Sequence, residues 1–169
     1  MKKSLARAFI FSLIAFFALN FLFYIIGYSV AGVLDLALNP IASHPTHSIY
    51  LLVYPSKYLP WELLNNFINY SSLGFVFLGG FISLVIASIV AGLIGGSIGK
   101  SFGGWALTII ISIALFIAIF TIDDFNLNYI SFSTTLVEGI IITVIAGAVN
   151  ALLFGALVII IALITGRSK

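Results

Sequence analysis

Four stretches of apolar residues dominate the sequence, and each is long enough to cross a membrane as a helix. They cover residues 8–30, 73–98, 104–122 and 136–164. A transmembrane helix needs about 20 consecutive apolar residues, because the hydrocarbon core of a bilayer is about 30 Å thick. We therefore predict an all-α membrane protein in which four transmembrane helices form a single integral membrane domain over residues 1–169.

The composition excludes a soluble protein. Hydrophobic residues make up 62% of the 169 residues, charged residues make up only 7%, and the mean hydropathy is +1.27. A soluble domain carries about 25% charged residues, so this chain cannot cover a surface that faces water. The sequence has no cysteine, which excludes disulfides, thiolate catalysis and cysteine-ligated metal centres.

The charged residues are sorted by position along the chain. Bases occur at both ends and in one short connection between spans, whereas acids occur in the other two connections. The first group is Lys2, Lys3, Arg7, Lys100, Arg167 and Lys169, and the second is Asp35, Glu62, Asp123, Asp124 and Glu138, together with Lys57.

Cytoplasmic connections of membrane proteins carry an excess of Lys and Arg. This bias predicts that both termini are cytoplasmic and that residues 31–72 form an outer loop of about 40 residues. We expect an integral protein of a prokaryotic cell membrane. The net charge of +2 does not indicate nucleic-acid binding, because the bases are sorted to one side of the membrane. The expected partner is therefore the lipid bilayer.

The first span also has some features of a signal peptide. It follows a basic start, and residues 29–31 form a small-residue cleavage motif. Its apolar run of about 23 residues is longer than the 7–15 residues of a signal peptide. We therefore expect the first span to be retained.

The outer loop is rich in proline and aromatic residues. Residues 48–54 are apolar but too few to span, so we expect them to lie at the membrane interface or to pack on the bundle. Pro60 is expected to begin an interfacial helix, since proline suits the first helical turn. Aromatic side chains gather at membrane interfaces, which predicts an outer belt and an inner one. The outer belt is Tyr50, Tyr54, Tyr58, Trp61 and Tyr70, with Tyr129 in the other outer loop, and the inner one is Trp105.

Every fourth residue is small over a long stretch around the second span. Residues four apart lie on one face of a helix, and in lipid a small-residue face lets another helix approach closely. The positions are Gly79, Ser83, Ala87, Ala91, Gly95, Gly99 and Gly103. The last span has a second such face at Gly147, Ala151 and Gly155. We expect the two faces to pack on each other or on another subunit, and the sequence does not separate contacts within the chain from contacts between chains.

Asn20 and Asn150 lie near the middle of the first and last spans. An amide without a partner at the bilayer centre costs several kcal/mol. We predict that both amides face the protein interior, close enough to bond to each other. Two alternatives stay open, namely a polar pore or ligand contact and a bond within each amide's own helix.

Three further residues are weak site candidates. His44 and His47 are three residues apart, but zinc needs three or four ligands, so we expect solvated loop side chains. Thr135 and Glu138 have capping-box spacing, with an ion or proton site at Glu138 as the alternative. We expect no catalytic, metal or cofactor site.

Three functions remain open. The first is a structural or accessory subunit of a membrane complex, because the small-residue faces exceed what one short bundle needs and would contact other membrane subunits or a second copy. The second is a small oligomeric channel or transporter. The first three spans carry no ionisable side chain, which argues against this function. A membrane enzyme is disfavoured, because cysteine is absent, both histidines lie in a loop and the acids are peripheral.

Overall fold

The computed structural model describes residues 4–44, 46–70, 73–122 and 136–166, and within them every regular element is helical. Four helices are long and apolar enough to cross a membrane, which indicates an integral membrane protein. They are α1 (Leu5–Val30), α5 (Gly74–Gly95), α6 (Ile98–Ile122) and α8 (Leu136–Gly166).

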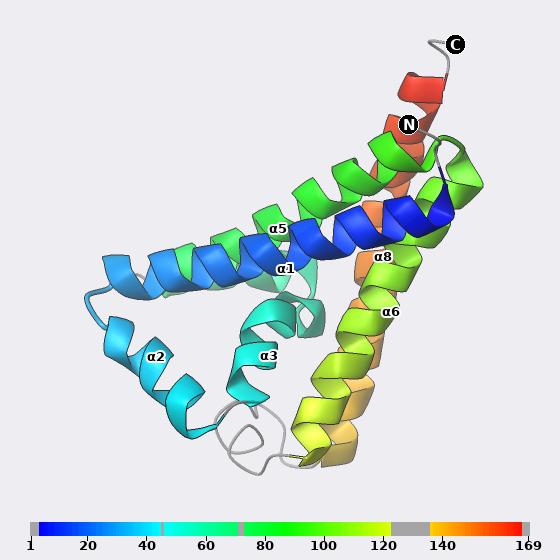
Figure 1. Ribbon diagram of the computed structural model, residues 1–169. Coiled ribbons are helices and arrows are strands. Elements are labelled where there is room, and N and C mark those ends of the chain that lie inside the picture. The colour runs from blue at the N-terminus through cyan, green and yellow to red at the C-terminus, as the bar shows by residue number, and fades with distance from the viewer. Residues whose placement is uncertain (1–3, 45, 71–72, 123–135, 167–169) are drawn as a thin grey trace.

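The four long helices form two pairs that diverge like the arms of a V (Figure 1). Helix α1 lies along α5, and α6 lies along α8. The start of α1, the end of α8 and the turn between α5 and α6 lie at one end, which we call the apex. The open end is called the mouth.

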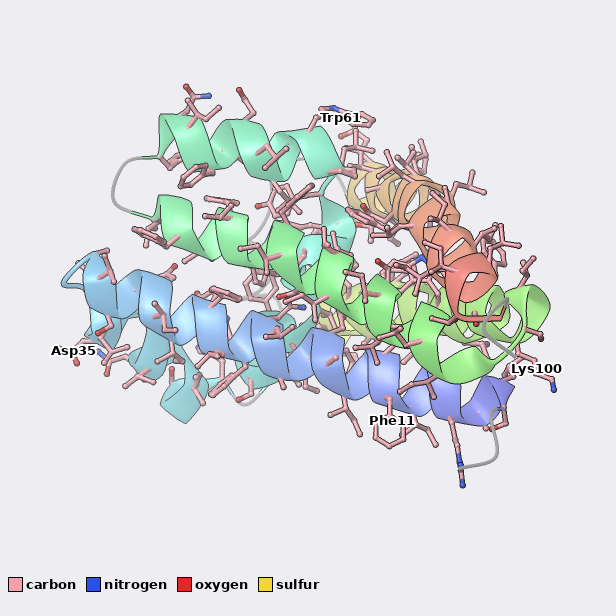
Figure 2. All side chains as sticks on the ribbon, turned by 90° about the horizontal axis from the view of Figure 1, so that it is seen from above. Phe11, Asp35, Trp61 and Lys100 are labelled. Atoms are coloured by element: carbon pink, nitrogen blue, oxygen red, sulfur yellow. The ribbon has the colours of Figure 1, made fainter. Side chains whose placement is uncertain are left out.

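Short helices connect α1 to α5. They are α2 (Leu34–Ser43), α3 (Thr46–Val53), the 3-10 helix η1 (Tyr54–Lys57) and α4 (Pro60–Asn69). Two of them, α3 and η1, lie between the arms. Helix α3 packs against α1 and α6, η1 contacts α5, α6 and α8, and α4 runs beside α5 (Figure 2). The chain therefore enters the V along α3, turns at η1 and returns along α4. We call residues 46–69 the hairpin.

The turn at the apex lies earlier in the sequence than predicted. Helix α5 ends at Gly95, and Gly96 has a φ of +82°, a left-handed conformation that favours glycine at a helix end. Helix α6 starts at Ile98, and Ser101 Oγ donates a hydrogen bond to the carbonyl oxygen of Gly92 at 3.3 Å. The boundaries predicted at residues 98 and 104 were therefore wrong.

The small residues of α5 pack inside the chain. Ser83, Ala87 and Ala91 are fully buried. A Cβ atom on Gly79 would clash with the Phe23 side chain of α1, and one on Gly95 would lie 2.3–2.6 Å from atoms of Ser101 if nothing moved. Close approach to α1 and α6 thus depends on these positions being small.

The predicted ladder does not continue through the apex. Gly99 and Gly103 belong to α6, and Gly99 is exposed with open space where a Cβ would stand. Gly103 faces Leu5, whose Cδ1 atom would be 3.0 Å from an added Cβ.

The small face of α8 meets α6, so it does not pair with the ladder of α5. An added Cβ on Gly147 would clash with Ile113, and one on Gly155 would lie 2.5 Å from Cε2 of Phe102. Between these glycines, the carbonyl oxygen of Ala151 accepts a hydrogen bond of 3.2 Å from Trp105 Nε1. Trp105 is fully buried, so its predicted place in an interfacial belt was wrong.

We predict that enlarging the α5 ladder destabilises the isolated chain. Ala87→Leu should lower the free energy of unfolding in detergent by about 1–3 kcal/mol, because overpacking a tight contact costs this much. Ile86→Leu, one residue away on the exposed side of α5, is the control and should change it by less than about 0.5 kcal/mol. Equal effects of the two changes would contradict the packing described here.

Candidate functional site

The turn of the hairpin is the most deeply enclosed part of the connection between α1 and α5. Residues 53–57 are all buried, in a run with no exposed position. The turn rests on α5 at Gly80, where an added Cβ would lie 2.9 Å from Tyr54 Oη and 3.1 Å from Pro55 Cγ. The Tyr54 hydroxyl donates a hydrogen bond to the carbonyl oxygen of Val76. A glycine on α5 therefore makes room for the turn.

Two asparagine side chains, one on each arm of the V, hold this turn by hydrogen bonds. Asn20 Nδ2 on α1 donates to the carbonyl oxygen of Leu52 at 2.7 Å. Asn150 Nδ2 on α8 donates to the carbonyl oxygen of Tyr58 at 3.0 Å. Both asparagines lie near the middle of their helices and are fully buried. The turn therefore sits at mid-length of the long helices.

The predicted bond between the two asparagines was wrong, although both side chains do face the interior. A backbone carbonyl at membrane depth needs a donor inside the protein, and the regular helical donors are lost where α3 passes into η1. The asparagines supply donors on either side of that break. Their Oδ1 atoms accept no hydrogen bond in the described structure.

The side chain of Lys57 projects from the turn into a group of aromatic rings. Its Nζ lies 4.8 Å from the ring centroid of Tyr58, 5.7 Å from that of Phe116 on α6 and 5.8 Å from that of Tyr50 on α3. The faces of aromatic rings attract a cation at this range. We call Tyr50, Tyr58 and Phe116 the aromatic cage.

Burial changes the acid–base behaviour of this turn, which lies outside the four long helices. Lys57 is only 9% exposed, and its burial lowers the pKa from 10.5 to about 7. Burial also raises the pKa of Tyr54. The pKa of Tyr58 is raised by burial and then by the nearby Glu62 carboxylate. The tyrosine hydroxyls therefore stay neutral, while the lysine can be either charged or neutral near pH 7.

Sequence analysis missed Lys57 and the aromatic cage. It grouped Lys57 with the loop charges and placed Tyr50, Tyr54 and Tyr58 in an interfacial belt. Tyr54 is 2% exposed, so that assignment was wrong for it. The usable signal was a single base within an apolar, tyrosine-rich stretch too short to span.

The return of the hairpin begins with a well-formed helix start. Pro60 stands in the first turn of α4, as predicted. Glu62 Oε2 accepts a hydrogen bond of 2.7 Å from the backbone N–H of Leu59. This carboxylate satisfies a donor that an isolated helix start would leave free.

Buried hydroxyl groups follow α6 from the apex toward the cage. Ser12 Oγ on α1 and Thr108 Oγ1 on α6 lie 2.6 Å apart, within hydrogen-bond distance. Ser112 Oγ donates to the carbonyl oxygen of Thr108 at 2.8 Å. Thr108, Ser112 and Phe116 are four residues apart and share one helix face. The hydroxyl groups on this face of α6 therefore lie in line with the Phe116 ring, which contacts Lys57.

The weak candidates from the sequence do not form a site. His47 is fully buried beside Tyr50, with ring centroids 5.3 Å apart, so the expectation of a solvated side chain was wrong for this residue. His44 is partly exposed. In the part of the chain that the structure describes, no three His, Asp or Glu side chains come together.

Glu138 is exposed in the first turn of α8. Its predicted capping partner Thr135 lies outside the described residues, and so do Asp123 and Asp124. The capping box therefore stays a prediction.

Comparison of the chain with protein-family models found no match, and comparisons with curated proteins and with solved structures found none either. The functional argument therefore rests on the hairpin and the groups around it.

We predict that Asn150 stabilises the hairpin through the carbonyl of Tyr58. Asn150→Leu should cost about 1–3 kcal/mol, because it leaves a part-buried acceptor without its donor. Amide hydrogen exchange of residues 53–58 should become faster in this variant. Asn65→Leu is the matched control, since Asn65 is exposed on α4. Unchanged exchange in Asn150→Leu would contradict the proposed tether.

Proposed function

We propose that the protein is a small membrane channel or transporter whose working part is the hairpin between its two helix pairs. One observation carries this proposal. The chain places the amino group of Lys57 inside the protein, at mid-length of four helices that are long enough to cross a membrane.

Two general constraints support a transport role. Irregular backbone at membrane depth is tolerated only where protein buries it or where it lines a water-filled cavity. Ionisable side chains at that depth are costly and commonly mark ion paths or proton relays. The first three spans lack such a group, which argued against transport, but the hairpin supplies Lys57 between them.

The small-residue faces no longer favour an accessory subunit. Residues of the α5 ladder and of the α8 face are occupied by α1 and α6 of the same chain. The surplus of packing faces that motivated the accessory role is therefore smaller than the sequence indicated.

We further propose that the apex is cytoplasmic and that the hairpin enters from the outer side of a prokaryotic cell membrane. In this orientation residues 31–72 form the outer loop. Lys100 lies near the apex and Asp35 lies at the other end of α1 (Figure 2). Arg7 at the start of α1 and Lys100 at the start of α6 both lie at this end, and bases on the cytoplasmic side support this orientation.

Cysteine labelling tests the orientation directly, because the chain has no cysteine of its own. Lys100→Cys and Asp35→Cys both introduce a thiol at an exposed position. In intact cells, a membrane-impermeant maleimide should label the Asp35→Cys variant and should leave the Lys100→Cys variant unlabelled until the membrane is broken. The reverse pattern would invert the proposed topology.

An accessory subunit remains a second candidate, and the outer face of α4 favours it. Trp61 and Ile68 are 55% and 75% exposed there, and the amides of Asn65 and Asn69 are exposed beside them. Amides that face lipid cost free energy. A second copy of this chain or another membrane subunit that covers α4 would remove that cost.

Ion flux through liposomes separates the two candidates. Purified protein is reconstituted at a low protein-to-lipid ratio, and fluxes of K⁺, Cl⁻ and H⁺ are followed with fluorescent indicators. We expect at least one of these ions to cross faster than in empty liposomes, with a loss of about tenfold in Lys57→Met.

Lys100→Met is the matched control for this experiment, because it removes an exposed lysine far from the hairpin. It should leave the flux unchanged. If none of the three ions crosses faster than in empty liposomes, the channel proposal is contradicted and the accessory role gains.

A further inference from the structure

We propose that the amino group of Lys57 is a proton-binding site and that H⁺ is the ion that this protein moves or couples to. The reaction is –NH₂ + H⁺ ⇌ –NH₃⁺ at Nζ, with the nitrogen lone pair forming the new bond and no leaving group. Its role in transport rests on the proposed function, whereas the binding site itself does not.

The aromatic cage argues against other ligands. The faces of Tyr50, Tyr58 and Phe116 carry negative electrostatic potential, which stabilises an ammonium and disfavours an anion near Nζ. A metal cation would be repelled by the same ammonium. A proton needs no cavity, so it suits an amine that is already packed among side chains.

Two opposing effects keep both protonation states accessible. Burial favours the neutral amine and lowers the pKa of Lys57 to about 7. The rings favour the charged ammonium. Near neutral pH, a modest change in the surroundings of Nζ therefore decides whether the proton is bound.

Several other titratable groups lie around the turn. Tyr50 and Tyr58 face Nζ, and burial raises the pKa of the Tyr58 phenol. His47 on α3 lies beside Tyr50, with ring centroids 5.3 Å apart. Around Tyr58 lie Tyr28, Tyr70 and the Glu62 carboxylate. Helix α6 contributes the Phe116 ring, and α1 and α8 contribute the neutral amides of Asn20 and Asn150. Asp123 and Asp124, after α6, lie in the part of the chain that the structure does not describe.

Polar groups are available on both sides of the turn. The hydroxyls of Ser12, Thr108 and Ser112 follow α6 from the apex toward Phe116. The Oδ1 atoms of Asn20 and Asn150 are buried acceptors that an ordered water molecule can satisfy. Hydroxyls and waters are the groups through which a proton would reach a buried amine.

Titration of the lysine side chains by NMR tests the binding site. The full-length protein is labelled with ¹³C-lysine in detergent micelles, and the Cε shifts are followed from pH 5 to pH 11. One resonance, absent from Lys57→Met, should titrate near pH 7. If the Lys57 resonance titrates near pH 10 or above, the proton site is overturned.

Thermal stability gives a second readout with a defined sign. At Lys57 the unfolded chain binds more protons than the folded one between pH 7 and pH 10.5, so this side chain makes the wild type more stable as pH rises through that range. Lys57→Met lacks this dependence. Its melting temperature should exceed that of the wild type at pH 6, and the difference should shrink by pH 9. A pH-independent difference would overturn the inference.

The NMR titration and the liposome flux experiment together distinguish failure of the proton site from failure of the proposed transport function. A Lys57 midpoint near pH 7 without ion flux would keep the proton site and contradict the transport role. Flux with a midpoint near pH 10 would keep the transport role and contradict the proton site.

Discussion

Backbone carbonyls that leave a helix at membrane depth must find donors inside the protein, and this constraint shapes the molecule. Between α3 and α4 the chain turns at mid-length of the long helices, where water is not available to satisfy it. Asn20 and Asn150 supply the missing donors from opposite arms of the V. The hairpin that carries the buried Lys57 is thus tied to both arms.

Small residues serve two different purposes around the hairpin. Gly79 brings α1 against α5, and Gly147 with Gly155 brings α8 against α6, so each arm is a tightly packed pair. Gly80, next to the first of these, instead admits the hairpin to the surface of α5. The same residue type thus serves both the close packing within each arm and the close contact between α5 and the hairpin.

The long helices could be predicted because the length of each apolar stretch reflects a single requirement, the thickness of the hydrocarbon core. The turn at the apex could not, since glycines at several nearby positions offered alternative ends and only the left-handed conformation of Gly96 decides among them. The depth of Asn20 and Asn150 was predictable, but their acceptors lie 32 and 92 residues away. No local pattern shows that a loop segment will enter the bundle, so the aromatic cage around Lys57 was missed as well.

The two amide contacts differ in when they become available during synthesis. Asn20 and Leu52 are both present once the hairpin has been made, before α5 is complete. The donor to Tyr58 resides in α8, the last long helix to leave the ribosome, because the chain emerges from its N-terminus. Until α8 arrives, the far side of the turn keeps an unsatisfied carbonyl. The nascent chain therefore holds a half-anchored hairpin, and insertion of the last helix completes its attachment.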